Sequence, residues 1–429
     1  MREMKDSGIP WIGEIPKEWE VVRNKNAFDN SKTLVGESWN STQLLSLTTK
    51  GIKAVNIGAT SGKVPDSYET YQIVEKDNLV MCLFDLDCSA VFSGLSLYQG
   101  MISPAYKVLT IKDGYLPAFY DKWFNYIFDG RKFMYLSKNI RYSLTYDEFA
   151  SLQIVKPSLA EQQKIAEFLD RKCAEIDEMI GLQEQIIEEL KAYKQSVITE
   201  AVTKGLNPNA PMRDSGIEWI GQIPEHWELS RIRNLGITQN GISKGGEFFG
   251  EGEPFVSYGD VYKNIELPPI VSGLIQSSQE EQERFSVCKG DVFFTRTSET
   301  IEEIGFSSTC TKTIERAVFA GFLIRFRPKQ GVLIDDFSKY YFRSNMHRAY
   351  FVKEMNIVTR ASLSQDLLKS LPVLLPSLAE QQAIADYLDK KCGEIDNLIS
   401  IKLSKIDSLK EYKKSIIYEY VTGKREVND

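Results

Sequence analysis

The stretch "PSLAEQQ" occurs twice in this chain, at Pro157–Gln163 and again at Pro376–Gln382, 219 positions later. The repeat is longer than seven residues. "RYSLTYDEFASLQIVKPSLAEQQKIAEFLDRKCAEID" begins at Arg141, and "RASLSQDLLKSLPVLLPSLAEQQAIADYLDKKCGEID" begins at Arg360, with the same offset and no gap. Internal similarity of this length has to be explained before any other feature, because it decides the architecture.

A second pair of segments matches at a different offset. "DSGIPWIGEIPKEWE" begins at Asp6 and "DSGIEWIGQIPEHWE" at Asp214, 208 positions later. The chain is therefore built of two halves with matched ends, and the two central regions between those ends do not align well. This pattern predicts one framework that carries two different domains.

The repeated segment at the C-terminal end of each half predicts a long helix. Ser158 with Glu161, and Ser377 with Glu380, have the spacing of a capping box, and a proline stands just before each cap. Apolar residues then recur in steps of three and four, as along a coiled-coil seam. The polar residues Gln183, Lys194, Lys402 and Lys413 interrupt that seam. The predicted seam residues are Leu169, Cys173, Ile176, Ile180, Ile187 and Leu190 in the first helix, and Leu388, Cys392, Ile395, Ile399, Ile406 and Leu409 in the second.

Connectivity constrains how these helices are arranged. The first helix carries the chain from one central region to the other, and the second carries it back, so two helices that pair must run antiparallel. An extended arrangement without pairing is the alternative. We predict an α+β fold with a pseudo-two-fold internal repeat, in which two mixed α/β domains are separated by the paired helices. The predicted boundaries are 1–156 for the first domain, 157–204 for the first helix, 205–375 for a linker and the second domain, and 376–429 for the second helix and tail.

Composition excludes several classes of protein. A net charge of −7 argues against a chain that is wrapped in nucleic acid, although a local basic patch remains compatible with it. The sequence has no apolar run of about 18 residues and no apolar signal core, which indicates a cytoplasmic protein. Phosphate-binding, methyltransferase and nuclease motifs are missing, and neither His226 nor His347 sits in a metal or nucleophile motif, so we expect no catalytic residue and no metal site. Both histidines are predicted to be ordinary surface or loop residues.

Small polar residues around isolated cations are the positive signals for DNA contact. Such loops can present side chains and backbone N–H groups to phosphates and bases, and an arginine at a strand end can reach guanine with two hydrogen bonds. Each of these residues, taken alone, is more typical of a solvated surface. The candidate DNA-binding residues are Lys50, Lys53, Lys63, Arg141, Ser143, Ser243, Lys244, Arg296, Thr297, Ser298, Arg360 and Ser362.

Taken together, these segments resemble the specificity subunit of type I restriction-modification systems. The resemblance rests on "DSGIEWIGQIPEHWE", a divergent domain and "LPSLAEQQAIADYLDKK", with the whole arrangement present twice; "GDVFFTR" and "GMISPAYKVL" add to it. It implies a non-catalytic subunit with two target-recognition domains, each of which reads half of a bipartite, asymmetric site in double-stranded DNA. The helices would set the spacing and dock two methyltransferase (modification) subunits, and restriction/translocase subunits would join them. S-adenosylmethionine, ATP and magnesium would bind those partners, and this chain would hold no cofactor.

Two other functions stay open at this point. A coiled-coil adaptor that spaces two protein-binding domains, without any role on DNA, accounts better for the acidic charge. It accounts less well for loops that pair Lys and Arg with Ser, Thr and Gly. A self-sufficient nuclease or methyltransferase would need catalytic motifs that the sequence lacks.

Overall fold

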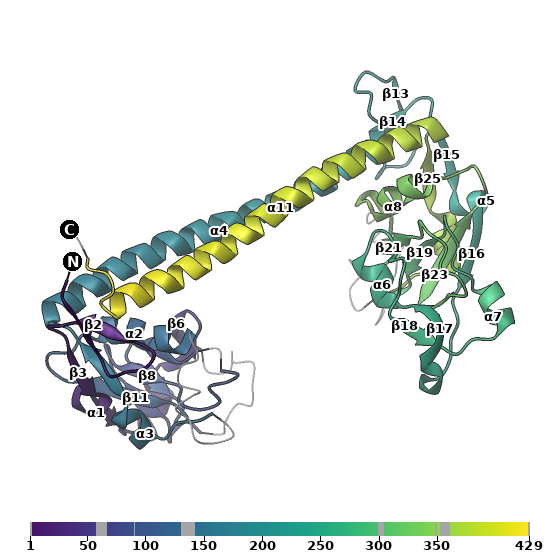
Figure 1. Ribbon diagram of the computed structural model, residues 1–429. Helices are drawn as coiled ribbons and strands as arrows, with labels where there is room; N and C mark the ends of the chain where they lie inside the picture. The colour runs from purple at the N-terminus through teal and green to yellow at the C-terminus, as the bar shows by residue number, and fades with distance from the viewer. Residues whose placement is uncertain are drawn as a thin grey trace. The chain divides into compact units, whose positions relative to one another are not determined.

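The computed structural model describes residues 2–56, 67–89, 91–129, 142–298, 304–347, 350–351 and 361–427 (Figure 1). The chain divides into two compact units. The first domain comprises Met1–Glu184 and Leu403–Asp429, and the second comprises Gln185–Lys402. Each compact unit therefore contains part of both long helices.

The two long helices are α4 (Leu159–Lys204) and α11 (Leu378–Val421). Within the first domain they run antiparallel, because Phe168 of α4 stacks near Tyr420 of α11 while Asp177, further along α4, pairs with the earlier Lys413. In the part of the chain that the structure describes, no helix is both long and apolar enough to cross a membrane.

The two helix starts differ in their capping. Ser377 and Glu380 form the complete reciprocal box, since Ser377 Oγ accepts from the Glu380 N–H and the Glu380 carboxylate accepts from the Ser377 N–H, both at 3.3 Å. At the first helix, Ser158 Oγ accepts from the Glu161 N–H at 3.3 Å, but the Glu161 side chain bonds elsewhere. The predicted box is thus complete only in the second copy.

The first domain contains two four-stranded sheets, ordered β6-β5-β10-β7 and β4-β11-β8-β9. Hairpin β1–β2 and the pair β3–β12 connect these sheets to the helices. The strands are β1 (Met4–Asp6), β2 (Glu14–Pro16), β3 (Glu20–Arg23), β4 (Phe28–Ser31), β5 (Leu44–Thr48), β6 (Gly51–Val55), β7 (Gln72–Val74), β8 (Leu79–Met81), β9 (Ser93–Leu95), β10 (Gly100–Ile102), β11 (Lys107–Ile111) and β12 (Gln153–Lys156), with helices α1 (Asn24–Ala27), α2 (Pro117–Asp129) and α3 (Tyr146–Ser151) and the 3-10 turn η1 (Gly36–Ser41).

The second domain contains sheets ordered β16-β23-β19-β21 and β18-β17-β22, hairpin β13–β14, and the pairs β15–β25 and β20–β24. Its strands are β13 (Met212–Asp214), β14 (Gln222–Pro224), β15 (Glu228–Arg231), β16 (Gly236–Asn240), β17 (Phe249–Val256), β18 (Gly273–Ile275), β19 (Val292–Thr295), β20 (Thr297–Ser298), β21 (Ser307–Thr309), β22 (Val318–Phe319), β23 (Leu323–Pro328), β24 (Ala361–Ser362) and β25 (Pro372–Leu375). Its short helices are α5 (Ile232–Leu235), α6 (Tyr258–Lys263), α7 (Gln279–Arg284), α8 (Asp335–Arg343) and α10 (Gln365–Ser370), with the 3-10 turn η3 (Gly246–Phe248).

The two central regions share one plan although their sequences do not align. The order β4-β11-β8-β9 of the first domain is repeated as β16-β23-β19-β21, and all pairs in both sheets are antiparallel. In both domains the other sheet joins an antiparallel hairpin to a parallel partner, β5–β6 with β10 and β17–β18 with β22. The two domains therefore share one topology although their sequences diverge, as the predicted pseudo-two-fold repeat requires.

Each domain has a core to which its part of the helices contributes. In the first domain Trp19 and Trp123 are buried with Leu169 of α4 and Ile416 of α11. In the second, Trp227 and Phe294 are buried with Val202 of α4 and Leu388 of α11. Burial of this apolar surface fixes each helix segment to its domain. His347 is buried against the rings of Tyr341 and Phe342, at centroid distances of 4.9 and 5.8 Å, so its prediction as a surface or loop residue is wrong.

Candidate nucleic-acid interface

The repeated "EQQ" joins each long helix to its domain. Gln162 is fully buried, and its amide oxygen accepts from the Leu116 N–H at 2.7 Å. Its amide nitrogen donates to the carbonyls of Pro157 at 2.9 Å and Gly114 at 3.2 Å. These bonds tie the helix start to the loop that leads into α2.

Gln381 repeats this arrangement in the second domain. It is 1% exposed, accepts from the Ile334 N–H at 2.9 Å, and donates to the carbonyls of Pro376 at 3.0 Å and Val332 at 3.1 Å. Replacing a buried amide that bonds three backbone groups lowers stability, because every substitution leaves one or more of those groups without a hydrogen-bond partner. This contact explains why the motif occurs twice.

The glutamate of the same motif binds the repeated tryptophan. The Trp19 indole N–H donates to Glu161 at 2.8 Å, and Trp227 donates to Glu380 at 3.3 Å. His226 Nε2 also lies 2.8 Å from Glu380 Oε1. Burial alone would raise the pKa of Glu380, but the bonds from His226, Trp227 and Ser377 outweigh it and hold the pKa below its ordinary value.

In the second domain, three segments meet at the end of β19. Arg296 follows this strand, its N–H donates to the Phe322 carbonyl at 2.9 Å, and its own carbonyl accepts from the Leu363 N–H at 2.7 Å. Strand β20 then pairs Thr297 with Ser362. The sequence-predicted residues Arg296, Thr297, Ser298 and Ser362 are thus brought together, and of Thr297 and Ser298 only the backbone is described.

Ser243 lies beside the same place. A Cβ added to Gly321 would lie 2.3 Å from Ser243 Oγ and 3.1 Å from the Ile242 carbonyl oxygen, so the two loops approach each other closely. Lys244, by contrast, points elsewhere: its ammonium group bonds Glu281 at 2.7 Å and the Gln276 carbonyl at 2.8 Å. The hydrogen bond from Lys244 lowers the pKa of Glu281. The predicted pairing of Lys244 with a phosphate would compete with this ion pair.

The equivalent place in the first domain has different chemistry. The Leu144 N–H donates to the Leu83 carbonyl at 2.7 Å, as Leu363 does to Arg296, so Leu83 occupies the position of the arginine. Ser143 stands where Ser362 does, and its Oγ accepts from the Asp85 N–H at 3.2 Å. A surface hollow lies at this place.

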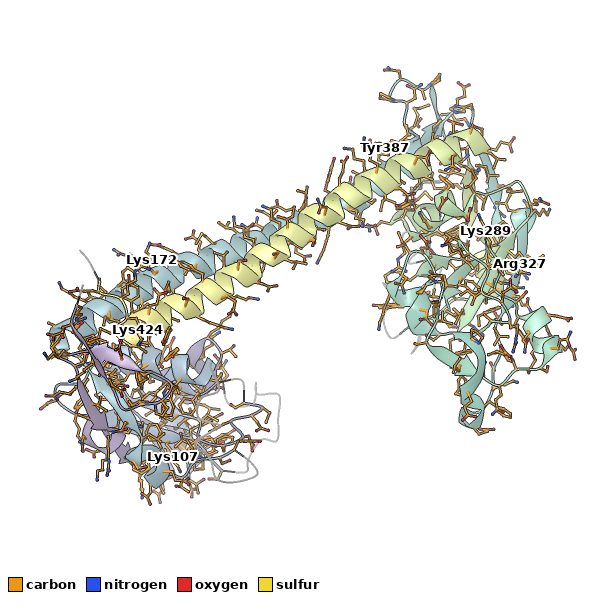
Figure 2. The ribbon with its side chains drawn as sticks, in the orientation of Figure 1. Lys107, Lys172, Lys289, Arg327, Tyr387 and Lys424 are labelled. Carbon is orange, nitrogen blue, oxygen red and sulfur yellow. The ribbon has the colours of Figure 1, made fainter. Side chains whose placement is uncertain are left out.

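The hollow has a volume of about 500 Å³. Lys32 and Lys107 line it, and within the described ranges neither ammonium group has an ion pair. Figure 2 labels Lys107 on the first domain. The other lining residues are Asn30, Leu83, Phe84, Ala105, Ser143, Leu144, Thr145, Tyr146 and Asp147.

The remaining predicted residues fall outside these two places. Lys50 and Lys53 are exposed on the β5–β6 hairpin, where the Lys50 N–H donates to Thr48 Oγ1 at 3.1 Å. Lys63, Arg141 and Arg360 lie outside the residues that the structure describes.

Of the predicted seam residues, Leu169, Ile176, Ile187, Leu388, Cys392, Ile395 and Ile406 are buried, and Cys173, Ile180, Leu190, Ile399 and Leu409 are partly buried.

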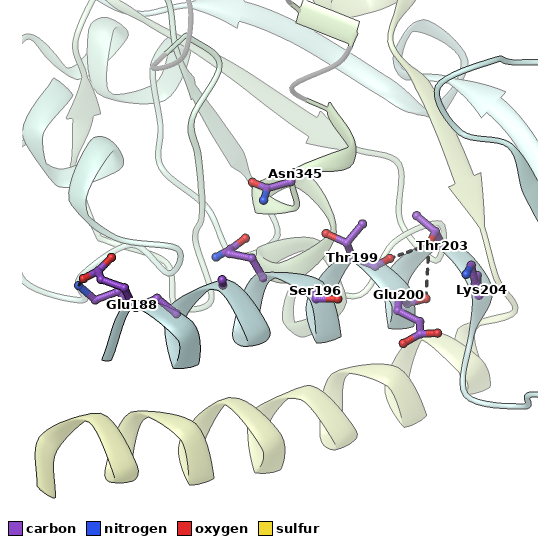
Figure 3. A pocket seen from close by; sticks show the side chains of 10 residues that line it. Glu188, Ser196, Thr199, Glu200, Thr203, Lys204 and Asn345 are labelled. Atoms are coloured by element: carbon purple, nitrogen blue, oxygen red, sulfur yellow. Dashed lines mark hydrogen bonds and ion pairs between the residues drawn. The ribbon is translucent and has the colours of Figure 1, made fainter. Parts of the chain in front are cut away.

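A second hollow follows the last turns of α4 in the second domain, with a volume of about 750 Å³. In Figure 3, Thr199 and Thr203 project from α4 toward the side on which Asn345 lies, and Ser196 is a further lining residue of α4. Thr203 Oγ1 donates back to the Thr199 carbonyl at 2.6 Å. Elsewhere in the described part of the chain, no group of three or more His, Cys, Asp or Glu residues could hold a metal ion.

Sequence reasoning missed Phe322, Lys32 and Lys107. Phe322 is an exposed aromatic residue inside the apolar run "AVFAGFLIRF", which predicts burial throughout. Lys32 and Lys107 lie far apart in sequence and meet only because β4 and β11 are paired. The one signal that could have found Phe322 is the preceding Gly321, which marks a turn.

The chain is similar to known proteins of one class. Residues 224–411 match the family described as Type I restriction modification DNA specificity domain. The chain is 25% identical to the putative type I restriction enzyme MjaX specificity subunit of Methanocaldococcus jannaschii, covering 96% of this chain and 95% of that one. It is 26% identical to the type I restriction enzyme EcoKI specificity subunit of Escherichia coli K12, over 61% of this chain and 56% of the relative.

Solved structures agree in fold. A chain reported under "Structural basis underlying complex assembly and conformational transition of the type I R-M system" has a TM-score of 0.72 at 14% identity, covering 96% of this chain and 99% of that one. The HsdS subunit from Thermoanaerobacter tengcongensis has a TM-score of 0.53 at 16% identity, covering 96% and 98%. The fold, with two domains of one topology joined to two long helices, is therefore that of solved type I specificity subunits. Residues 224–411 match the type I DNA specificity domain, and the chain is similar over nearly its whole length to a specificity subunit of a type I restriction enzyme.

Proposed function

We propose that this chain reads a bipartite, asymmetric site in double-stranded DNA, with one half-site for each domain. The observation that carries the proposal is the pair of equivalent places at the sheet ends. One presents Arg296 with Ser362, and the other presents a hollow lined by Lys32 and Lys107. One topology with two chemistries is what two different half-sites require.

Catalysis belongs to the partners in this proposal. Two methyltransferase subunits dock on the helical framework, restriction/translocase subunits join them, and S-adenosylmethionine, ATP and magnesium bind those subunits in the cytoplasm. The uninterrupted helices α4 and α11 support a role in setting the gap between half-sites, since a helix advances about 1.5 Å per residue and DNA about 34 Å per turn.

The deciding experiment is a methylation map. The chain is expressed with its methyltransferase subunit in a host that lacks DNA methylation, and N6-methyladenine is then located by sequencing. We expect a split, asymmetric motif that disappears without this chain. No motif, with a methyltransferase that is competent with another specificity subunit, would favour the adaptor function instead. Methylation by this chain alone would show that it is an enzyme.

Exchange of one domain tests whether each domain reads its own half-site. Replacing residues 20–156 with the corresponding region of another specificity subunit should change one half-site and leave the other. A change in both half-sites would contradict independent reading by the two domains.

A further inference from the structure

Phe322 of the second domain is a large apolar side chain that stands in solvent beside Arg296, an arginine without an ion pair among the described residues. Phe322 is 64% exposed, whereas Phe293, Phe294 and Phe326 of the adjoining strands β19 and β23 are fully buried. Leaving a phenyl ring in water costs free energy, and the buried phenylalanines of the same sheet avoid that cost. Single exposed apolar side chains are common on protein surfaces, so the exposure of Phe322 gains its meaning from the arginine beside it.

Phe322 and Arg296 are cross-strand neighbours. Strands β19 and β23 pair in antiparallel register up to Thr295 and Leu323, and the bond from the Arg296 N–H to the Phe322 carbonyl extends that register by one residue. Directly opposite residues of an antiparallel pair project from the same face, with Cβ atoms about 5 Å apart. Within the described residues, the Arg296 side chain makes no hydrogen bond or ion pair, unlike the nearby Arg325 and Arg327.

We propose that Phe322 and Arg296 together read neighbouring base pairs in the major groove of one half-site. Phe322 contacts the 5-methyl group of a thymine, and the Arg296 guanidinium bonds N7 and O6 of a guanine. This inference rests on the proposed function and names the residues that would discriminate bases within it. The thymine methyl group and the N7 and O6 pair are both displayed in the major groove, and a spacing of about 5 Å suits base pairs stacked about 3.4 Å apart.

The first domain lacks this pair. Leu83 stands at the position of Arg296, and Ala105, in the hollow, belongs to the turn before β11 that corresponds to the turn of Phe322 before β23. We therefore expect the Phe322–Arg296 pair to recognise a thymine methyl group only in the half-site of the second domain. The half-site of the first domain serves as an internal control for the effect of thymine replacement.

The experiment removes the methyl group from the DNA and the ring from the protein. The complex of the full chain with its methyltransferase subunit is titrated with duplexes in which each thymine of the methylated motif is replaced singly by deoxyuridine. At one thymine, in one half-site, the wild-type complex should lose about five- to tenfold in affinity. Phe322→Ala should lose a similar factor on the unmodified duplex and nothing further on the deoxyuridine duplex. Ile270→Ala, which truncates an apolar side chain that is 86% exposed, is the matched control and should change neither affinity.

The inference is overturned if deoxyuridine is neutral at every thymine, if the half-sites contain no thymine, or if Phe322→Ala stays as sensitive to the methyl group as the wild type. A wild-type complex that selects no bipartite motif overturns the proposed function as well. A selected motif with an unaffected Phe322→Ala variant overturns only the reading by Phe322.

Discussion

The ammonium group of Lys194 on α4 lies 2.7 Å from both carboxylate oxygens of Asp396 on α11. Lys413 on α11 makes the same contact with Asp177 on α4, again with both distances at 2.7 Å. Both lysines are among the polar residues that interrupt the apolar seam, and each pairs with an aspartate of the opposite helix. A polar residue in a seam generally lowers stability and fixes register, and here the fixed register is visible as an ion pair in each domain.

We expect the Lys194–Asp396 pair to contribute about 0.5–1 kcal/mol, because the Asp396 side chain is mostly exposed. A double-mutant cycle with Lys194→Met and Asp396→Asn, read from the unfolding of the second domain by calorimetry, measures this coupling, which should shrink as salt increases. The exposed pair Lys391–Glu394 is the control and should couple more weakly. An equal coupling in both pairs would mean that the position across the seam has no special effect.

Replacing Gln381 by Leu should destabilise the second domain by about 2–4 kcal/mol, because the substitution leaves buried backbone groups without the hydrogen bonds that the amide now provides. The neighbouring Gln382 provides a matched control. Its amide bonds only Asp386 of the same helix and is exposed, so Gln382→Leu should change stability by less than about 0.5 kcal/mol. Thermal unfolding of the two variants distinguishes them, and equal effects would refute the role given to the buried amide.

Glu380 should make the second domain sensitive to acid. Its pKa in the folded chain lies below the ordinary 4.5, so its stabilising effect is complete above that pH and is lost as the pH falls through the lower folded value. Between pH 5 and 3 the melting temperature of the second domain should therefore fall more steeply in the wild type than in Glu380→Gln. Parallel curves for the two proteins would show that the bonds from His226 and Trp227 do not depend on the carboxylate charge.

Lys107 should act on DNA through charge. In the complex, Lys107→Ala is expected to weaken binding to all sequences by a similar factor and to reduce the slope of log K against log salt by about 1. Lys289→Ala provides the control, since Lys289 is an exposed lysine of the second domain that pairs with Asp335. A changed motif, with an unchanged salt slope, would assign Lys107 to base reading rather than to phosphate contact.

Much of the framework could be predicted from sequence because its signals are local. The helix starts at Ser158 and Ser377, the apolar seam and the strands in "NLVMCLF" and "DVFFTR" all follow from neighbouring residues, and the structure confirms the helices and those strands. The common sheet plan could not be predicted, because strands of equal topology tolerate different sequences wherever burial alone is required.

The candidate interface was predictable only in fragments. The sequence singled out Arg296 for its place after an apolar strand, and Ser362 for its place before a repeated segment. Their approach depends on pairing between β20 and β24, which joins residues more than sixty positions apart. Lys244 forms an ion pair with Glu281, and no local sequence pattern indicates that contact.

By itself, the sequence determined the internal repeat, the two long helices and the resemblance to one class of protein, because each depends on periodicity or on identity between segments. Only the tertiary structure decided what the repeat does. Gln162 and Gln381 are buried and bond distant backbone groups, and Phe322 stays exposed within an apolar run. Burial and long-range pairing belong to the folded chain as a whole, so no window of sequence contains them.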